Sequence, residues 1–275
     1  MKLVIVGAKG MLGSMLSQVF ADYHPLTVDK EEVDITTIES VRTVLREAAA
    51  DLVINAAAYT NVDGAEEHAE DAYLVNETGV KNLATVAHEL GATLVHFSTD
   101  YVFPGTQKEG YKEADSPGPA VNAYGASKLA GERALKESGC NFYLVRTAWL
   151  YGPNGRNFVT TMLDLAQKNN TLQVVEDQYG SPTYTKDLSL FVRQLIDEKY
   201  PFGIYHGTNS GSASWFEFAE KIFEHTPNLA ISVKPVTSEE FPRPAKRPTY
   251  SILLNTKGPK MRPWQDALAS FVRGV

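Results

Sequence analysis

The chain has little of what stabilises secreted proteins or holds metal ions. Its single cysteine, Cys140, excludes an internal disulfide, and its apolar neighbours predict a buried thiol. Neither a CxxC pair nor an HExxH motif is present, so the sequence predicts no metal site. No uninterrupted apolar run approaches the roughly 18 residues that span a bilayer. Because no signal peptide precedes Leu3 either, we expect a soluble, cytoplasmic protein with no membrane association.

The chain also has no excess of basic residues. The formal net charge of the chain is −7 at pH 7. Proteins that bind nucleic acid without sequence preference need a basic face that neutralises phosphates. We therefore expect no nucleic-acid partner, and a small molecule becomes the more natural ligand.

What the sequence does have is an alternation of short apolar runs and helical patterns, which is typical of a parallel sheet with helices on both faces. We predict an α/β fold with a doubly wound, Rossmann-like sheet. An NAD(P)-binding domain is expected over residues 1–150, to which later segments are free to return, and residues 151–275 are expected to form mainly a smaller substrate-binding lobe. The predicted strands are Leu3–Val6, Leu26–Val28, Leu52–Ile54, Thr93–Phe97 and Phe142–Val145.

A glycine-rich loop follows the first predicted strand and leads into a helix. Its spacing is G-x-x-G-x-x-G. Glycines there allow a tight turn and a close approach of the backbone to a pyrophosphate, whose charge the helix N-terminus favours. The loop therefore predicts dinucleotide binding by Gly7, Lys9, Gly10, Met11, Leu12 and Gly13.

Two residues give opposite indications about which dinucleotide binds. Asp29 ends the second strand, where a Rossmann unit places an acid against the adenosine ribose, and a carboxylate there favours NADH. Lys9 favours NADPH because it offers a 2′-phosphate a counter-charge. The sequence leaves the choice between NADPH and NADH open, including the use of both.

Other residues at the ends of the strands are expected to surround the cofactor. Thr36 and Glu39 have the spacing of a capping box, which would put Asp34 and Ile35 in a loop beside the adenine. Small side chains after the third strand leave room for something flat to approach the backbone. These small residues are Ala56, Ala57 and Ala58.

Tyr124 and Lys128 are four residues apart at the start of a predicted helix, so their side chains share one face. A fixed positive charge lowers the pKa of a tyrosine from about 10. Such a tyrosine can give its proton to a carbonyl oxygen while hydride reaches the carbon. Thr99 and Asp100 follow the fourth strand, at the sheet edge where α/β proteins bind ligands. His96, in the middle of that strand, is interpreted as a core residue.

Taken together, these motifs resemble those of the extended short-chain dehydrogenase/reductases. Within that superfamily, the segments 98–103, 122–132, 146–152 and 157–158 are similar to the dTDP-4-dehydrorhamnose reductase family. The resemblance implies NAD(P)H-dependent reduction of the C4 keto group of dTDP-4-dehydro-β-L-rhamnose. It also implies that Tyr124 donates the proton, that Lys128 holds the nicotinamide ribose and lowers the tyrosine pKa, and that Thr99 polarises the carbonyl.

The remaining loops are expected to bind the sugar nucleotide. Arg243, Lys246 and Arg247 form a basic cluster that suits a nucleoside diphosphate. Trp149 can stack on a sugar face, whereas Trp215, which follows a predicted capping box, is interpreted as structural. The expected substrate-binding residues are Thr99, Asp100, Phe103, Trp149, Asn157, Gln178 and Arg247.

Two alternatives stay open at this point. One is a different enzyme on the same scaffold, such as an epimerase or a reductase of another 4-keto sugar nucleotide. The other is a non-catalytic protein that resembles the regulatory subunit of methionine adenosyltransferase. The oligomeric state is open as well, with a homodimer as one option, because the chain ends sooner after Leu254 than many relatives do.

Overall fold

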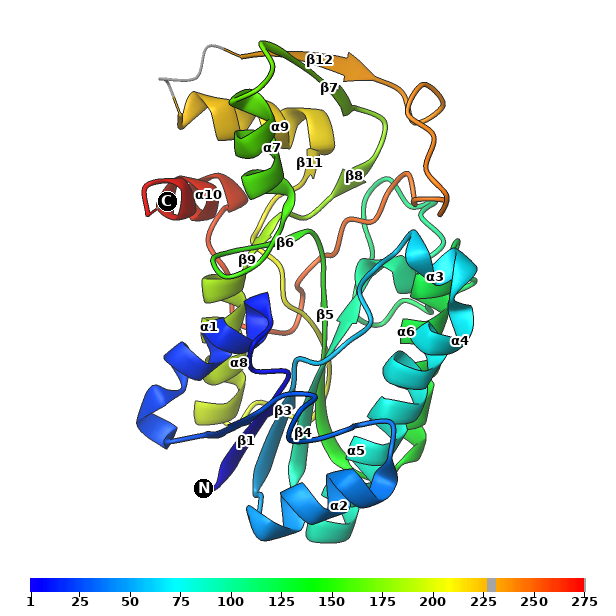
Figure 1. Cartoon of the computed structure of the whole chain (residues 1–275), viewed down its shortest axis with the longest axis vertical. Coiled ribbons are helices and arrows are strands. Elements are labelled where there is room, and N and C mark those ends of the chain that lie inside the picture. The colour runs from blue at the N-terminus through cyan, green and yellow to red at the C-terminus, as the bar shows by residue number, and fades with distance from the viewer. Residues whose placement is uncertain (227–230, 275) are drawn as a thin grey trace.

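The computed structural model describes residues 1–226 and 231–274. Within this part of the chain, a parallel sheet of six strands has the order β10-β5-β4-β3-β1-β2 (Figure 1). All five strands predicted from the sequence are confirmed, and β4 extends as far as Thr99. The strands are β1 (Leu3–Val6), β2 (Leu26–Val28), β3 (Leu52–Asn55), β4 (Thr93–Thr99), β5 (Asn141–Thr147) and β10 (Gly203–His206).

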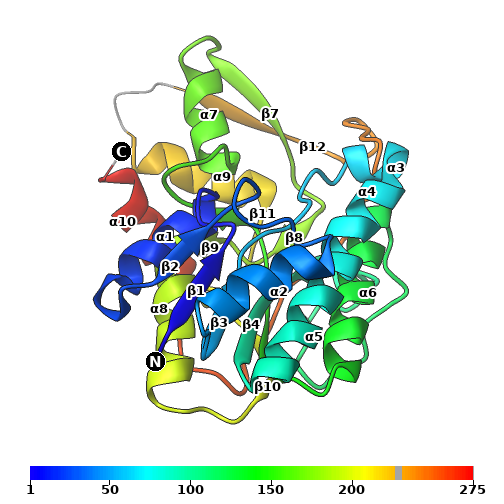
Figure 2. The same cartoon turned by 60° about the horizontal axis from the view of Figure 1, so that its bottom comes forward.

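Helices cover both faces of this sheet, which confirms the doubly wound fold. On one face lie α2 (Ile38–Glu47), α5 (Val80–Leu90) and α6 (Ala123–Glu137), and on the other lie α1 (Met11–Val19) and α8 (Thr185–Asp197) (Figure 2). Alternate residues of one strand enter opposite cores. Val4 and Val6 pack under α2 and α5, whereas Leu3 and Ile5 pack under α1 and α8. This two-sided burial explains why the strands are continuous apolar runs.

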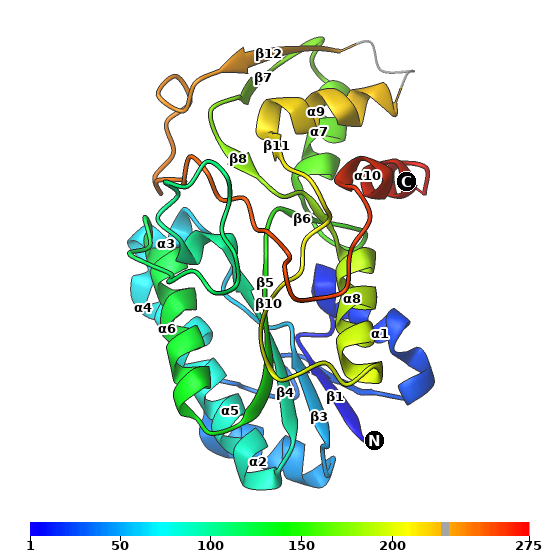
Figure 3. The ribbon, with the colours of Figure 1, turned by 180° about the vertical axis from the view of Figure 1, so that it is seen from behind.

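A second lobe packs against the carboxyl ends of the strands (Figure 3). It has its own apolar core, which includes Val159, Phe218 and Trp264. Between segments of this lobe the chain returns to the sheet to form α8 and β10. The lobe contains α7 (Phe158–Ala166), β7 (Thr171–Val175), β8 (Tyr179–Gly180), β11 (Ala213–Ser214), α9 (Trp215–Glu224), β12 (Ser232–Val236) and α10 (Trp264–Val272).

Short elements connect these parts. Among the described residues, no helix is both long and apolar enough to cross a membrane. The connecting elements are η1 (Ala21–Tyr23), α3 (Gly64–Glu67), α4 (Ala69–Tyr73), η2 (Leu74–Gly79), η3 (Asp100–Val102), β6 (Leu150–Tyr151) and β9 (Thr183–Tyr184).

The two predicted capping boxes have different outcomes. The box of Ser214 with Glu217 at the start of α9 is confirmed. The box of Thr36 with Glu39 is wrong, because α2 begins at Ile38 and no described side chain caps it. The Asp34 carboxylate instead accepts hydrogen bonds from the backbone N–H and the hydroxyl of Thr36. This local turn competes with the helix for the same backbone groups and delays its start.

Two buried residues match their predicted surroundings. Cys140 is a buried thiol, and burial raises its pKa to about 11. His96 lies in the core of β4, where its Nδ1 is 3.1 Å from the Asn55 amide nitrogen. Burial lowers the pKa of His96 well below its ordinary value, so the ring is neutral at pH 7.

Candidate active site

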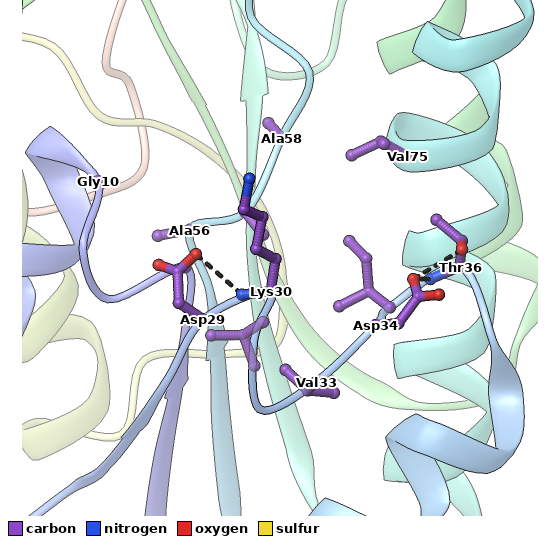
Figure 4. Close-up of a pocket in the computed structure, with 13 residues that line it drawn as sticks. Gly10, Asp29, Lys30, Val33, Asp34, Thr36, Ala56, Ala58 and Val75 are labelled. Atoms are coloured by element: carbon purple, nitrogen blue, oxygen red, sulfur yellow. Dashed lines mark hydrogen bonds between the residues drawn. The ribbon is translucent and has the colours of Figure 1, made fainter.

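A cavity of about 490 Å³ opens at the carboxyl ends of β1, β2 and β3. Figure 4 shows Asp29 and Lys30 on one side of it and Asp34 with Thr36 on the other. Several of the residues predicted to bind the cofactor line this cavity. They are Gly7, Gly10, Asp29, Asp34, Ile35, Ala56, Ala57 and Ala58.

The glycine loop has the geometry of a pyrophosphate cradle. Gly7 has φ +75°, and a Cβ atom there would lie 2.6 Å from the backbone nitrogen of Ala57. At Gly13 a Cβ would lie 2.0 Å from the Gly7 carbonyl oxygen, so this glycine lets α1 pack against the loop. No described side chain caps α1 after Gly10. The first N–H groups of the helix are thus available to an anion.

Lys9 lies in the same loop but is not among the residues that line the cavity. Its ammonium group forms an ion pair with the Glu31 carboxylate at 2.9 Å. Its backbone N–H donates to Asp29 Oδ2 at 2.9 Å. Lys9 therefore connects the glycine loop to the turn after β2, and only its position in the loop was evident from the sequence.

A second cavity, of about 510 Å³, continues from the first and shares the same alanines. Met11 and Leu12 of the glycine loop line it. So do the three predicted catalytic residues, Thr99, Tyr124 and Lys128. The structure thus brings together the end of β4 and the first turns of α6 beside the cradle, as the sequence predicted.

The N-terminus of α6 is well defined, and this fixes the positions of Tyr124 and Lys128. Asn122 is the N-cap, and its side-chain oxygen accepts a hydrogen bond from the backbone N–H of Gly125 at 2.7 Å. A Cβ atom at Gly125 would lie 2.3 Å from the Tyr101 carbonyl oxygen, so this glycine lets α6 approach the segment after β4. Tyr124 is thereby held next to Thr99.

The pKa of Tyr124 differs from the expectation. Burial, and then the negative charge of Asp100, raise the pKa of Tyr124 to about 12, and a hydrogen bond with Thr99 opposes them. The expected lowering by Lys128 is absent, since the lysine ammonium donates instead to the Phe97 carbonyl oxygen at 2.6 Å. Tyr124 is therefore protonated at neutral pH and has a proton to give.

Lys128 is itself buried, and burial lowers its pKa to about 8, opposed by the negative charge of Glu132. Glu132 lies one helical turn further along α6 and is fully buried. It accepts hydrogen bonds from Ser98 and Arg146. This carboxylate was not predicted from the sequence, although the spacing of Tyr124, Lys128 and Glu132 places it on the same helical face.

Asp100 lies beside these groups at the start of η3. It accepts a hydrogen bond from the Thr99 hydroxyl at 2.9 Å. Burial raises the pKa of its carboxyl group to about 6. The position beside the second cavity agrees with the predicted contact to substrate.

Trp149 lines the second cavity and is partly buried. One face is stacked on Trp215, with ring centroids 3.4 Å apart. A Cβ atom at Gly180 would lie 2.3 to 2.6 Å from three atoms of the indole, so that residue covers the ring as well. Trp149 thus packs against the start of α9 at the edge of the cavity, and its stacking on the sugar stays a prediction.

A third cavity, of about 400 Å³, lies in the second lobe and is lined by two of the predicted substrate residues, Gln178 and Arg247. Arg247 and Arg243 both pair with the Asp63 carboxylate of the sheet domain, Arg243 at 2.6 Å. Residues that the sequence analysis did not assign to substrate also line this cavity. They include Tyr101, Phe158, Met162, Trp215 and Phe241.

Two predicted substrate residues, Phe103 and Asn157, are not among the residues that line these cavities. Phe103 is fully buried and stacked on Tyr111, with ring centroids 4.2 Å apart. Asn157 is the N-cap of α7, and its amide donates to the Gly152 and Gly155 carbonyls. Both side chains have packing or hydrogen-bond partners within the protein, and their contact with substrate stays a prediction.

Nothing in the local sequence distinguished the aromatic residues of the third cavity from core residues. Phe158 and Trp215 each begin a helix, and only the packing of α7 against α9 turns their rings toward the same cavity. Within residues 1–226 and 231–274, no three His, Cys, Asp or Glu side chains gather in a way that could hold a metal ion.

Comparison with known proteins shows the family of this chain. The sequence model described as the RmlD substrate binding domain matches residues 1–275. The chain is 41% identical over 282 residues to a dTDP-4-dehydrorhamnose reductase of Mycolicibacterium smegmatis, covering 100% of this chain and 86% of that protein. It is 40% identical to the spore coat polysaccharide biosynthesis protein SpsK of Bacillus subtilis, covering 99% of this chain and 97% of that protein.

Solved structures give the same result. A dTDP-4-dehydrorhamnose reductase from Bacillus anthracis in complex with NADP has a TM-score of 0.95 to this chain. The two are 43% identical, and the alignment covers 100% of both chains.

Proposed function

The chain belongs to the RmlD substrate-binding-domain family, and from this premise we propose that it is a dTDP-4-dehydrorhamnose reductase. The reaction is the NAD(P)H-dependent reduction of the C4 keto group of dTDP-4-dehydro-β-L-rhamnose to dTDP-L-rhamnose. The observation that carries the proposal is the joint presence of the glycine cradle and of Thr99, Tyr124 and Lys128 in adjoining cavities of a full-length family member.

The cavities fit a nicotinamide dinucleotide. Space for the pyrophosphate and ribose is left by the positive φ of Gly7 and by the small side chains of Ala56, Ala57 and Ala58. The N-terminus of α1 offers free N–H groups to the pyrophosphate. We propose that the adenosine lies between Asp29 and Asp34, and that Lys128 holds the nicotinamide ribose. The cofactor would supply the hydride.

The groups of this chain would then act on the carbonyl oxygen. Thr99 and Tyr124 line the same cavity, and we propose that both hydroxyl groups contact the carbonyl oxygen there. Because Tyr124 is protonated at neutral pH, it can transfer its proton to that oxygen as negative charge develops there. The Lys128 ammonium donates to the Phe97 carbonyl oxygen, which fixes its position one turn along α6 from Tyr124.

The third cavity suits the nucleotide part of the substrate. Arg243 and Arg247 offer guanidinium groups to a diphosphate, and aromatic rings of Phe158, Trp215 and Phe241 offer apolar surface to a base. We propose Gln178 and Arg247 as substrate-binding residues on this ground. A homodimer stays a prediction, which light scattering of the purified protein would test.

The test is NADH and NADPH oxidation, followed at the nicotinamide absorbance, with dTDP-4-dehydrorhamnose generated in place by its upstream enzymes. We expect rapid oxidation that depends on this sugar nucleotide. Omission of the sugar nucleotide is the control for background oxidation. The absence of oxidation with both NADH and NADPH, or oxidation only with an unrelated keto sugar nucleotide, would contradict the proposed reaction.

A further inference from the structure

We infer that Glu31 sets the preference of this chain between NADPH and NADH, by holding the Lys9 side chain that would otherwise bind the 2′-phosphate. The inference rests on the proposed function, because it assumes that the glycine cradle holds a nicotinamide dinucleotide. It assigns a role in cofactor selection to a residue outside the glycine motif and outside the cavity lining.

The geometry begins with the ion pair itself. Lys9 Nζ and Glu31 Oε2 are 2.9 Å apart, and their side chains are 65% and 53% exposed. Lys9 belongs to the glycine loop, and Glu31 to the turn after β2. The two segments are held together by the hydrogen bond from Lys9 N to Asp29 Oδ2. The pair therefore lies at the Asp29 side of the first cavity and is open to solvent.

Asp29 does not decide the cofactor on its own. Its Oδ2 accepts the backbone N–H of Lys9 and its Oδ1 accepts that of Lys30, each at 2.9 Å. These donors offset part of the carboxylate charge, while each oxygen keeps a lone pair for a ribose hydroxyl. The acid can thus accept a hydrogen bond from NADH without the full repulsion that a free carboxylate would exert on a 2′-phosphate.

The basic groups around Asp29 are not equivalent. Lys30 lines the cavity, and Figure 4 shows its side chain extending from the Asp29 side toward the Ala58 side. Lys9 is neutralised by Glu31. Glu32 is turned back onto the chain, where its carboxylate accepts the Asp29 N–H at 2.8 Å. Replacement of Glu31 would therefore release the Lys9 ammonium at the position where the cavity meets the glycine loop.

The expected consequence concerns only ligands with a 2′-phosphate. In the native chain such a phosphate must compete with Glu31 for Lys9, which narrows the difference in affinity between NADPH and NADH. Glu31→Gln keeps a polar side chain of the same length but removes the competing charge. A new exposed ion pair between the released Lys9 ammonium and the phosphate should strengthen binding roughly 3- to 10-fold.

The experiment uses the full chain and four ligands. Calorimetry gives dissociation constants for adenosine 2′,5′-bisphosphate and 5′-AMP, and nicotinamide fluorescence gives those for NADPH and NADH. In Glu31→Gln we expect roughly 3- to 10-fold tighter binding of the two 2′-phosphate ligands, with 5′-AMP and NADH within about twofold of the native chain. Lys9→Gln should weaken the 2′-phosphate ligands, and most of the gain from Glu31→Gln should be lost in the Lys9→Gln background.

Glu224→Gln is the matched control. Glu224 also forms an exposed ion pair with a lysine, Lys221, but on α9 in the other lobe. The Glu224→Gln variant removes the same charge from the protein as Glu31→Gln and should leave all four dissociation constants unchanged. An equal gain in Glu224→Gln, or a gain in Glu31→Gln that persists without Lys9, would overturn the inference.

The binding assay also separates this inference from the proposed function. It needs neither sugar nucleotide nor turnover. If the native chain bound none of the four ligands, the proposed cofactor site and the inference would both be wrong. If it bound them with a ratio that Glu31→Gln left unaltered, only the role of Glu31 would be wrong.

Discussion

Glu132 of α6 and Arg146 of β5 form a two-pronged ion pair that is completely buried between helix and sheet. Arg146 Nε and Nη2 donate to the two carboxylate oxygens at 2.8 and 2.7 Å. Ser98 donates to the same carboxylate at 2.7 Å. Because Ser98 precedes Thr99 and Glu132 follows Lys128 by one turn, this network connects the two elements that carry the candidate catalytic residues.

Glu132→Ala should therefore destabilise the protein strongly. It leaves the Arg146 guanidinium buried without its carboxylate, and breaking a buried pair in this way costs about 3–5 kcal/mol. Urea unfolding would measure the loss. Glu224→Ala is the control, since its pair with Lys221 is exposed and contributes at most about 1 kcal/mol. Equal losses in the two variants would contradict a special role for the buried network.

Tyr124→Phe should abolish most turnover and leave cofactor binding nearly intact. It removes the hydroxyl that donates the proton, a step that contributes roughly 10²- to 10⁴-fold to the rate. Steady-state rates and an NADPH titration would give the two quantities. Tyr143→Phe serves as the control, because that hydroxyl donates to the Tyr200 carbonyl away from the site. An undiminished rate in Tyr124→Phe would contradict the proposed proton transfer from Tyr124.

Gly7→Ala should lose both stability and cofactor affinity. The residue has φ +75°, and its new Cβ would clash with the backbone of Ala57 in the cradle. Gly91→Ala separates the two causes, since Gly91 has φ +68° but nothing lies within 4 Å of a Cβ there. We expect Gly91→Ala to cost only about 1–2 kcal/mol for the backbone conformation and to bind NADPH normally. Normal NADPH affinity in Gly7→Ala would show that the loop is not the cradle.

Asp100 should make the protein less stable as the pH rises through the acid range. Burial raises the pKa of Asp100 from 3.8 to about 6, so between these values the folded state holds a proton that the unfolded state has lost. Stability from this group is therefore present below about pH 4 and lost as the pH rises to 6. Asp100→Asn removes this dependence.

The comparison of native chain and Asp100→Asn isolates that group from the other carboxylates. Urea unfolding at pH 4.5 and pH 7 should show the variant gaining about 2 kcal/mol relative to the native chain between the two pH values. A difference that is the same at both pH values would mean that Asp100 ionises normally in the folded protein.

Much of the fold was predictable from the sequence because it depends on local patterns. Buried strands appeared as continuous apolar runs, and a doubly wound sheet follows from their alternation with helices. The spacing of Tyr124 and Lys128 placed both on one helical face, and the strand before Thr99 placed that residue at the ligand-binding edge. The start of α2 was mispredicted because Asp34 offers Thr36 an alternative set of hydrogen bonds.

The tertiary structure alone decided which side chains are free to meet a ligand. The sequence could not show that Trp149 is covered by Trp215, that Phe103 is buried against Tyr111, or that Asp63 pairs with arginines about 180 residues away. Such contacts join segments that are distant in the chain, and no local periodicity encodes them. Local sequence patterns predicted the elements and the chemistry that they carry. Packing between distant segments sets where that chemistry is exposed, because a side chain buried by a distant segment has no surface left for substrate.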